Sequence, residues 1–293
     1  MFNGGTRGIT IMNTNNSKNR SLLYFLLLLL VLSVPCWVLG AIYDVQIFPG
    51  FNLYQLPLAL SAVTAFILIY REGGSAGVIA LLKRTYDFRN IKSKIWYLPM
   101  LLTIPSIGFI EYLILRFSGT SIPSPQFSLA ILLSNISIFF MTFGEELGWT
   151  GYLIDPMQER WSALKSGILL GVVWAVIHFP ILFINGYSFE WIFWHSLYIV
   201  TVRVLMVWIY NNAGKSLFSM ALTHATFGLF WSLWPTENLH LTVPFYDPRI
   251  MAFTGIFYVV IVTLLWGSKT LAQYRFARSG DRLSRGAQKR ATA

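Results

Sequence analysis

Residues 143–152 read FGEELGWTGY, and they place two adjacent glutamates, Glu145 and Glu146, in a run that is otherwise apolar. A carboxylate in the hydrocarbon region of a membrane costs several kcal/mol, so it is retained only where it faces the interior of a helical bundle or a water-filled cavity. The pair therefore indicates one of two things. It is a structural site, in which the carboxylates are neutral or paired with a buried cation, or it is an active site.

The composition is that of a membrane protein. The chain has 293 residues, of which 55% are hydrophobic and 12% are charged, a balance typical of a bundle of spanning helices. The single cysteine, Cys36, lies inside the first apolar run, which excludes a disulfide framework and a cysteine-based metal site within one chain. The net charge of +10 comes from basic residues in short loops and tails, so it indicates membrane orientation and not nucleic-acid binding.

Hydropathy predicts an all-α fold, a polytopic membrane bundle of about eight transmembrane helices. The two glutamates inside it predict a polar intramembrane cavity, which is catalytic if they form an active site. The expected spans are residues 21–41, 54–70, 97–115, 128–154, 164–184, 189–210, 216–234 and 250–266. The first run is too long for a signal peptide and is expected to be an anchored span. An apolar stretch at 76–82, flanked by basic residues, is expected to form a helix on the cytoplasmic face, and 118–125 a loop.

Four regions follow from this pattern. They are a disordered cytoplasmic tail (1–20), N-terminal transmembrane helices (21–127), a catalytic helical core (128–234), and a last transmembrane helix with a basic cytoplasmic tail (235–293). Eight spans put both ends on one side, and all of the 22 Lys and Arg residues except Arg116, Arg203 and Arg249 fall in segments expected inside. The expected localisation is therefore the cell membrane, multi-pass, with both termini cytoplasmic.

Histidines in later spans accompany the two glutamates. His178 lies four residues after Trp174 and so on the same helix face, and His224 lies two spans further on. A single histidine in an apolar helix is usually a hydrogen-bonded core residue. Two glutamates and two histidines on three spans can instead converge on one cavity, which structural polar groups have no need to do.

Three blocks of this sequence resemble one known family. They are FGEELGWTGYL at 143–153, GVVWAVIHFP at 171–180, and GKSL at 214–217 leading to His224. Together, residues 143–228 resemble the CPBP family, the CAAX-processing and bacteriocin-processing intramembrane endopeptidases also called the Abi family. The chain departs from the family pattern at Thr150, where the family usually has arginine, and at Gly228, where it usually has asparagine. Thr150 cannot supply a positive charge, and Gly228 has no amide to help bind an oxyanion.

The resemblance implies a mechanism of peptide hydrolysis. It makes Glu145 the general base, His178 a second residue that positions the same water, and His224 the residue that holds the water or the oxyanion. Glu146 points about 100° away around the helix and is expected to play a supporting role. No cofactor is favoured. The alternative is a zinc ion held by Glu145, His178 and His224, although the sequence has no His-Glu-x-x-His helix.

Three further ionisable residues lie within the spans. Arg203 could pair with Glu146 or Glu111 and replace the charge that Thr150 lacks, or its side chain could extend to the interface near Tyr210. Glu111 and His195 belong to none of the three blocks, and both structural and pathway roles are open for them.

The favoured function is hydrolysis of a peptide bond by a glutamate-activated water in an intramembrane protease. One alternative is a catalytically impaired family member that acts as a membrane scaffold or bacteriocin-immunity protein, and another is a proton-coupled transporter. The absence of paired broken helices in corresponding halves favours the peptidase over the transporter. The expected partners are bilayer lipids and a peptide or protein substrate, lipidated or not, and no nucleic acid.

Overall fold

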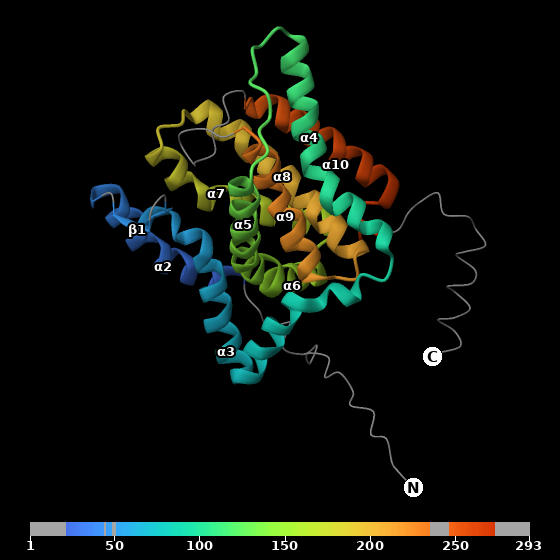
Figure 1. Cartoon of the computed structure of the whole chain (residues 1–293). Coiled ribbons are helices and arrows are strands. Elements are labelled where there is room, and N and C mark those ends of the chain that lie inside the picture. The colour runs from blue at the N-terminus through green and yellow to red at the C-terminus, as the bar shows by residue number, and fades with distance from the viewer. Residues whose placement is uncertain (1–21, 44, 49–50, 235–245, 273–293) are drawn as a thin grey trace, which may run out of the picture.

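The computed structural model describes residues 22–43, 45–48, 51–234 and 246–272, and almost all of this part of the chain is helical (Figure 1). The long helices are α2 (Leu22–Tyr43), α3 (Pro57–Lys83), α4 (Tyr97–Phe117), α5 (Leu129–Gly148), α7 (Ala163–Ile184), α8 (Phe189–Asn212), α9 (Leu217–Ser232) and α10 (Pro248–Trp266). The expected tail at 1–20 and most of the expected basic tail lie outside the described residues.

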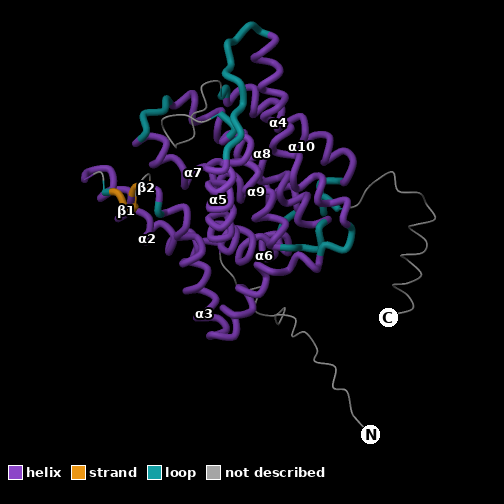
Figure 2. The backbone as a smooth tube through the Cα atoms, viewed as in Figure 1, coloured by secondary structure: helices purple, strands orange, loops and turns teal. Residues whose placement is uncertain are grey.

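The predicted polytopic helical bundle is confirmed. Seven helices in the described part of the chain are long and apolar enough to cross a membrane, and an eighth apolar helix, Leu217–Phe230, is shorter. Figure 2 shows the expected loop between α4 and α5, where no helix forms between Phe117 and Leu129. The chain is therefore a multi-pass membrane protein.

Two local features differ from the expectation for residues 44–94. The second span was expected to end at residue 70, but α3 continues to Lys83, and the helix expected at 76–82 is present as its last part. Its axis breaks at Gly74, where φ is 60° and ψ is −158°, a conformation that glycine adopts without steric cost. A short antiparallel hairpin, β1 (Gln46–Phe48) and β2 (Phe51–Asn52), precedes the turn η1 (Leu53–Gln55) and was not predicted.

The glutamate-bearing helix does not run unbroken to residue 154 as expected. It ends as an α-helix at Gly148 and continues as a π-helix, η4 (Trp149–Ile154), before the short helix α6 (Asp155–Arg160). The wider turn leaves carbonyl groups to be paired from outside the helix, and Arg84 Nη1 donates to the Gly151 carbonyl at 3.0 Å. Isolated π-turns are frequent at functional sites, and this one begins three residues after Glu146.

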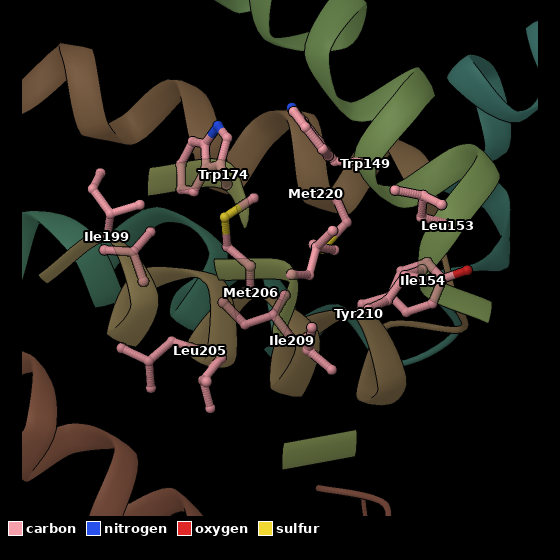
Figure 3. Packing of buried hydrophobic residues seen from close by; sticks show 14 of the residues in the cluster. Trp149, Leu153, Ile154, Trp174, Ile199, Leu205, Met206, Ile209, Tyr210 and Met220 are labelled. Carbon is pink, nitrogen blue, oxygen red and sulfur yellow. The ribbon is translucent and has the colours of Figure 1, made fainter. Parts of the chain in front are cut away.

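Helix α8 is the most buried span and forms the centre of the core, with α7, α9, α4 and α10 packed around it. In Figure 1, α5 and α8 lie near the centre, with α2 and α3 on one side and α4 and α10 on the other. Gly167 and Gly171 of α7 let the backbone of α8 approach closely, since a Cβ at Gly171 would lie 2.8 Å from the Cα of Val200. Figure 3 shows buried apolar side chains of α8 beside those of η4, α7 and α9.

Helix α5 is fixed against α3 next to the two glutamates. The hydroxyl of Ser61 lies 3.2 Å from the backbone oxygen of Glu145 and donates to it. One turn later, an ideal Cβ at Gly148 would lie 2.5 Å from the carbonyl oxygen of Ser61, so only glycine fits there. The close approach sets the position and rotation of the end of α5, and therefore the directions of Glu145 and Glu146.

Helix α9 begins where Asp87 caps it. Asp87, in η2 (Arg84–Asn90), accepts hydrogen bonds from the hydroxyl of Ser216 at 2.6 Å and from the backbone N–H groups of Leu217 at 2.9 Å and Phe218 at 3.1 Å. A carboxylate at a helix N-terminus satisfies unpaired N–H groups and opposes the positive end of the helix dipole. Because the cap fixes the start of α9, it also fixes the position of His224 along the helix axis, two turns later.

Glycine 148 allows a direct test of the α3–α5 contact. We expect Gly148→Ala to lower the stability of the detergent-solubilised protein by about 1–3 kcal/mol, the usual cost of overpacking. The matched control is Gly144→Ala, one turn earlier, where an added Cβ meets nothing within 4 Å. It should be neutral or stabilising by up to about 1 kcal/mol. Thermal unfolding of both variants measures the difference, and equal midpoints would contradict the proposed contact.

Candidate active site

A cavity of about 210 Å³ lies among five of the helices. It is lined by Gln55, Leu58, Glu145, Trp174, His178, Ile181, His195, Ile199, His224 and Phe227. Three of the four predicted site residues, Glu145, His178 and His224, thus meet at one hollow although they come from α5, α7 and α9. Glu146 does not line it, and His195, for which the sequence left the role open, does.

Glu146 is fully buried and bound from three directions. Its carboxylate accepts two hydrogen bonds from Arg203, from Nη1 at 2.9 Å and from Nη2 at 3.1 Å, in the bidentate geometry that suits a guanidinium. The hydroxyl of Thr150 donates to Oε2, and Nδ1 of His224 lies 3.0 Å from Oε1. Glu146 therefore joins α5, η4, α8 and α9 at one point, which suits the supporting role expected for it.

Arg203 is the charge partner that Thr150 does not supply. Both Arg203 and Glu146 have side chains with 0% exposure, so the arginine does not extend to the interface near Tyr210. The guanidinium also lies 4.2 Å from the ring centroid of Trp174, in cation–π geometry. The structure places Arg203 on Glu146 and not on Glu111, and it shows that Thr150 still contributes a hydrogen-bond donor to the same carboxylate.

Trp174 contacts the three predicted site residues that line the cavity, Glu145, His178 and His224. Its indole N–H donates to Glu145 Oε2 at 3.2 Å, and its backbone oxygen lies 2.6 Å from Nδ1 of His178. The ring of His224 packs edge-on against the indole at 5.0 Å between centroids. Sequence reasoning placed Trp174 on the same face as His178 but did not predict its contacts with Glu145 and His224, which lie 29 and 50 residues away in the sequence.

The hydrogen-bond partners of the two histidines set their tautomers. The Trp174 carbonyl can only accept a hydrogen bond, so Nδ1 of His178 carries the proton and, in the neutral ring, Nε2 has the lone pair. The carboxylate of Glu146 acts in the same way on Nδ1 of His224. In its neutral form, each ring thus offers Nε2 as an acceptor to a water molecule in the cavity.

The fit of a metal ion depends on how closely the candidate ligands approach one another. In the residues that the structure describes, no group of three or more His, Cys, Asp or Glu side chains is close enough to hold a metal ion. A zinc site made of Glu145, His178 and His224 would therefore require these side chains to move closer together.

The two residues without a motif have separate environments. Glu111 is buried on α4 and accepts a hydrogen bond from the backbone N–H of Asp247, just before α10, which is a structural contact. His195 on α8 is 3% exposed, with Nδ1 2.7 Å from the hydroxyl of Tyr246 and its ring stacked on Trp191. Glu111 thus does not line the cavity, whereas His195 does.

Comparison with known proteins identifies the same part of the chain. Residues 125–230 match the family model described as type II CAAX prenyl endopeptidase Rce1-like. The chain is also 30% identical over 181 residues to CAAX prenyl protease 2 of Methanococcus maripaludis, a match that covers 59% of this chain and 61% of that relative. The matched family region contains Glu145, Glu146, His178 and His224 together with the whole π-helix.

The buried ion pair makes a clear prediction about stability. We expect Arg203→Met to lower the free energy of unfolding by about 3–5 kcal/mol, because it leaves the Glu146 carboxylate buried without its cation. The double variant Glu146→Leu/Arg203→Met should recover much of this loss, since neither charge is then buried. The matched control is Arg249→Met on α10, an arginine whose side chain is 57% exposed and which should change stability by at most about 1 kcal/mol.

Thermal unfolding in detergent measures all three variants. An Arg203→Met protein as stable as the wild type would show that the ion pair contributes nothing to the fold.

Proposed function

We propose that the chain, which is similar to the CAAX-processing intramembrane endopeptidases of the CPBP family, hydrolyses a peptide bond with a water molecule activated by Glu145. The observation that carries the proposal is the single cavity lined by Glu145, His178 and His224. A carboxylate base and two imidazoles around one hollow can bracket one water molecule, which is what amide hydrolysis without a nucleophilic side chain requires.

The proposed reaction begins with the water between these groups. Glu145 takes one proton from the water, while Nε2 of His178 or His224 accepts a hydrogen bond from its other O–H group. The hydroxide attacks the carbonyl carbon of the substrate, and the carbonyl oxygen becomes an oxyanion. Protonated Glu145 then gives its proton to the leaving amine, so the base ends the cycle as it began.

Neighbouring groups prepare Glu145 and the histidines for these steps. The indole N–H of Trp174 holds one carboxylate oxygen of Glu145, which leaves the other oxygen for the water. Glu146, neutralised by Arg203, orients the ring of His224 through Nδ1. Glu146 therefore acts through His224 and does not contact the substrate.

We propose a lipidated peptide as the first substrate class to test. The relative from Methanococcus maripaludis is named for CAAX prenyl proteolysis. Half of the cavity lining consists of the apolar or aromatic residues Leu58, Trp174, Ile181, Ile199 and Phe227, which suit an apolar chain near the scissile bond.

We also propose the cell membrane as the location, with both termini cytoplasmic, because Lys and Arg residues are concentrated in the segments expected inside.

The central prediction concerns cleavage by variants of the cavity. With a farnesylated peptide ending in a C-a-a-X tetrapeptide as probe, we expect Glu145→Gln to lose at least about 100-fold in kcat, the lower end of the contribution of a general base. His178→Ala should lose activity to a similar degree. The matched control is Glu190→Gln at the exposed start of α8, which should cleave like the wild type.

Detergent-solubilised proteins with equal unfolding midpoints are compared by mass spectrometry of the products. Unchanged turnover in Glu145→Gln would refute the assignment of the base. No cleavage by the wild type of this peptide or of secreted leader peptides would favour the scaffold or immunity role.

Metal removal tests the proposed metal-free chemistry. We expect purified protein to contain much less than one zinc per chain by elemental analysis, and we expect its activity to survive treatment with 1,10-phenanthroline. The reason is that Glu145 must be free to take a proton, which a carboxylate bound to a metal cannot do. Stoichiometric zinc, lost together with activity and restored by added zinc, would instead establish the three-ligand site.

A further inference from the structure

We infer that His195 donates a hydrogen bond from Nε2 to the developing oxyanion and so takes the place of the asparagine that Gly228 replaces. This inference rests on the proposed function, because an oxyanion forms only if a peptide bond is hydrolysed. It names a residue outside the three sequence blocks, and the argument depends on which partner each histidine of the cavity has.

The cavity has few hydrogen-bond donors. In their neutral forms His178 and His224 present Nε2 lone pairs to the cavity, since their Nδ1 protons point to a carbonyl and to a carboxylate. The indole N–H of Trp174 already donates to Glu145, and Gly228 has no side chain. A tetrahedral oxyanion without a donor costs about 2.7–4 kcal/mol of transition-state stabilisation in other proteases. The other two lining side chains with an N–H group are Gln55 and His195.

His195 differs from the other two histidines in its partner. Its Nδ1 lies 2.7 Å from the hydroxyl of Tyr246, and a phenol, unlike a carbonyl or a carboxylate, can donate. When Tyr246 donates to Nδ1, Nε2 must carry the proton of the neutral ring. Within the described residues, no protein group forms a hydrogen bond with that Nε2, although the ring lines the cavity. An N–H group is then available to an anionic oxygen.

His195 is also held rigidly, as a transition-state donor must be. Its ring stacks on Trp191 with 4.6 Å between centroids and an interplanar angle of 22°. It lies on α8, the same buried helix whose Arg203 binds Glu146, so one rigid element positions both groups. Gln55, in contrast, lies in the turn η1 and uses its Oε1 to accept from the backbone N–H of Asn52 at 2.6 Å. Preorganised donors of this kind contribute more than groups that must reorient.

The first experiment measures kcat and KM with the farnesylated C-a-a-X peptide. We expect His195→Phe, which keeps the stacking on Trp191 but has no N–H, to lose about 10²–10³-fold in kcat with little change in KM. His195→Gln retains a donor and should lose less. Tyr246→Phe removes the group that fixes the tautomer, so this positioning residue should give an intermediate loss. The competing variant Gln55→Leu should lose much less in kcat than His195→Phe.

A rescue experiment separates a donor from a merely structural residue. We expect Gly228→Asn, placed in the His195→Phe protein, to restore at least about tenfold in kcat, because it returns an amide to the position where the family has one. An added Cβ at Gly228 would lie 3.1 Å from Cδ1 of Ile138, the end of a flexible side chain, so only a small shift is needed. The matched control, Gly228→Ala in the same background, adds the same Cβ without the amide and should not rescue.

Binding separates this inference from the proposed function. The probes are a peptide phosphonamidate, which mimics the tetrahedral anion, and the amide of the same sequence. Wild-type protein should prefer the phosphonamidate, and His195→Phe should lose that preference by about 10²-fold while it binds the amide equally well. This measurement needs no turnover, so a wild type that never cleaves would defeat the proposed function and leave the role of His195 measurable.

Two results would overturn the inference. One is a His195→Phe protein that keeps both its kcat and its preference for the phosphonamidate. The other is loss of both in Gln55→Leu, which would assign the donor to η1 instead.

Discussion

The ion pair between Glu146 and Arg203 is the constraint on which the rest of the site depends. Neither side chain is exposed, so both have lost their hydration, and only good geometry can offset that cost. Here the geometry is bidentate, Thr150 and His224 complete the shell of the carboxylate, and the Trp174 indole covers the guanidinium. Because these residues come from α5, η4, α7, α8 and α9, the pair holds together all the helices that contribute ionisable groups to the cavity.

Adjacent positions in one helix explain how two neighbouring glutamates serve different purposes. Consecutive residues point about 100° apart, so one carboxylate can face the buried pair while the other faces the cavity. Glu146 has four protein hydrogen-bond donors around it, and Glu145 has one, the Trp174 indole, with its other oxygen left toward the hollow. The same turn of α5 is held by Ser61, so a small rotation of the helix would disturb both roles at once.

Sequence reasoning recovered what depends on local pattern. Hydropathy gave the spans, and the blocks around Glu145, His178 and His224 predicted residues that meet at one cavity. The pairing of Arg203 with Glu146 was predicted correctly, because Arg203 is a cation deep within an expected span and needs an acid as partner. The π-helix, the Asp87 cap and the contacts of Trp174 could not be predicted, since each depends on side chains brought close by the fold. His195 has no motif, and its partner Tyr246 is 51 residues away.

The shortness of α9 affects how the bilayer meets this protein. Its 16 residues rise only about 24 Å at 1.5 Å per residue, less than the ~30 Å hydrocarbon core of an average bilayer. Because other helices, chiefly α4 and α5, cover α9, with Leu229 as its exposed large apolar residue, the shortfall is expected to draw water and headgroups in at the end of the bundle toward the level of His224. A peptide could then reach the cavity while most of its polar backbone stays hydrated. Only a few residues would have to place unpaired amide groups in hydrocarbon, so the free-energy cost of entry would be small.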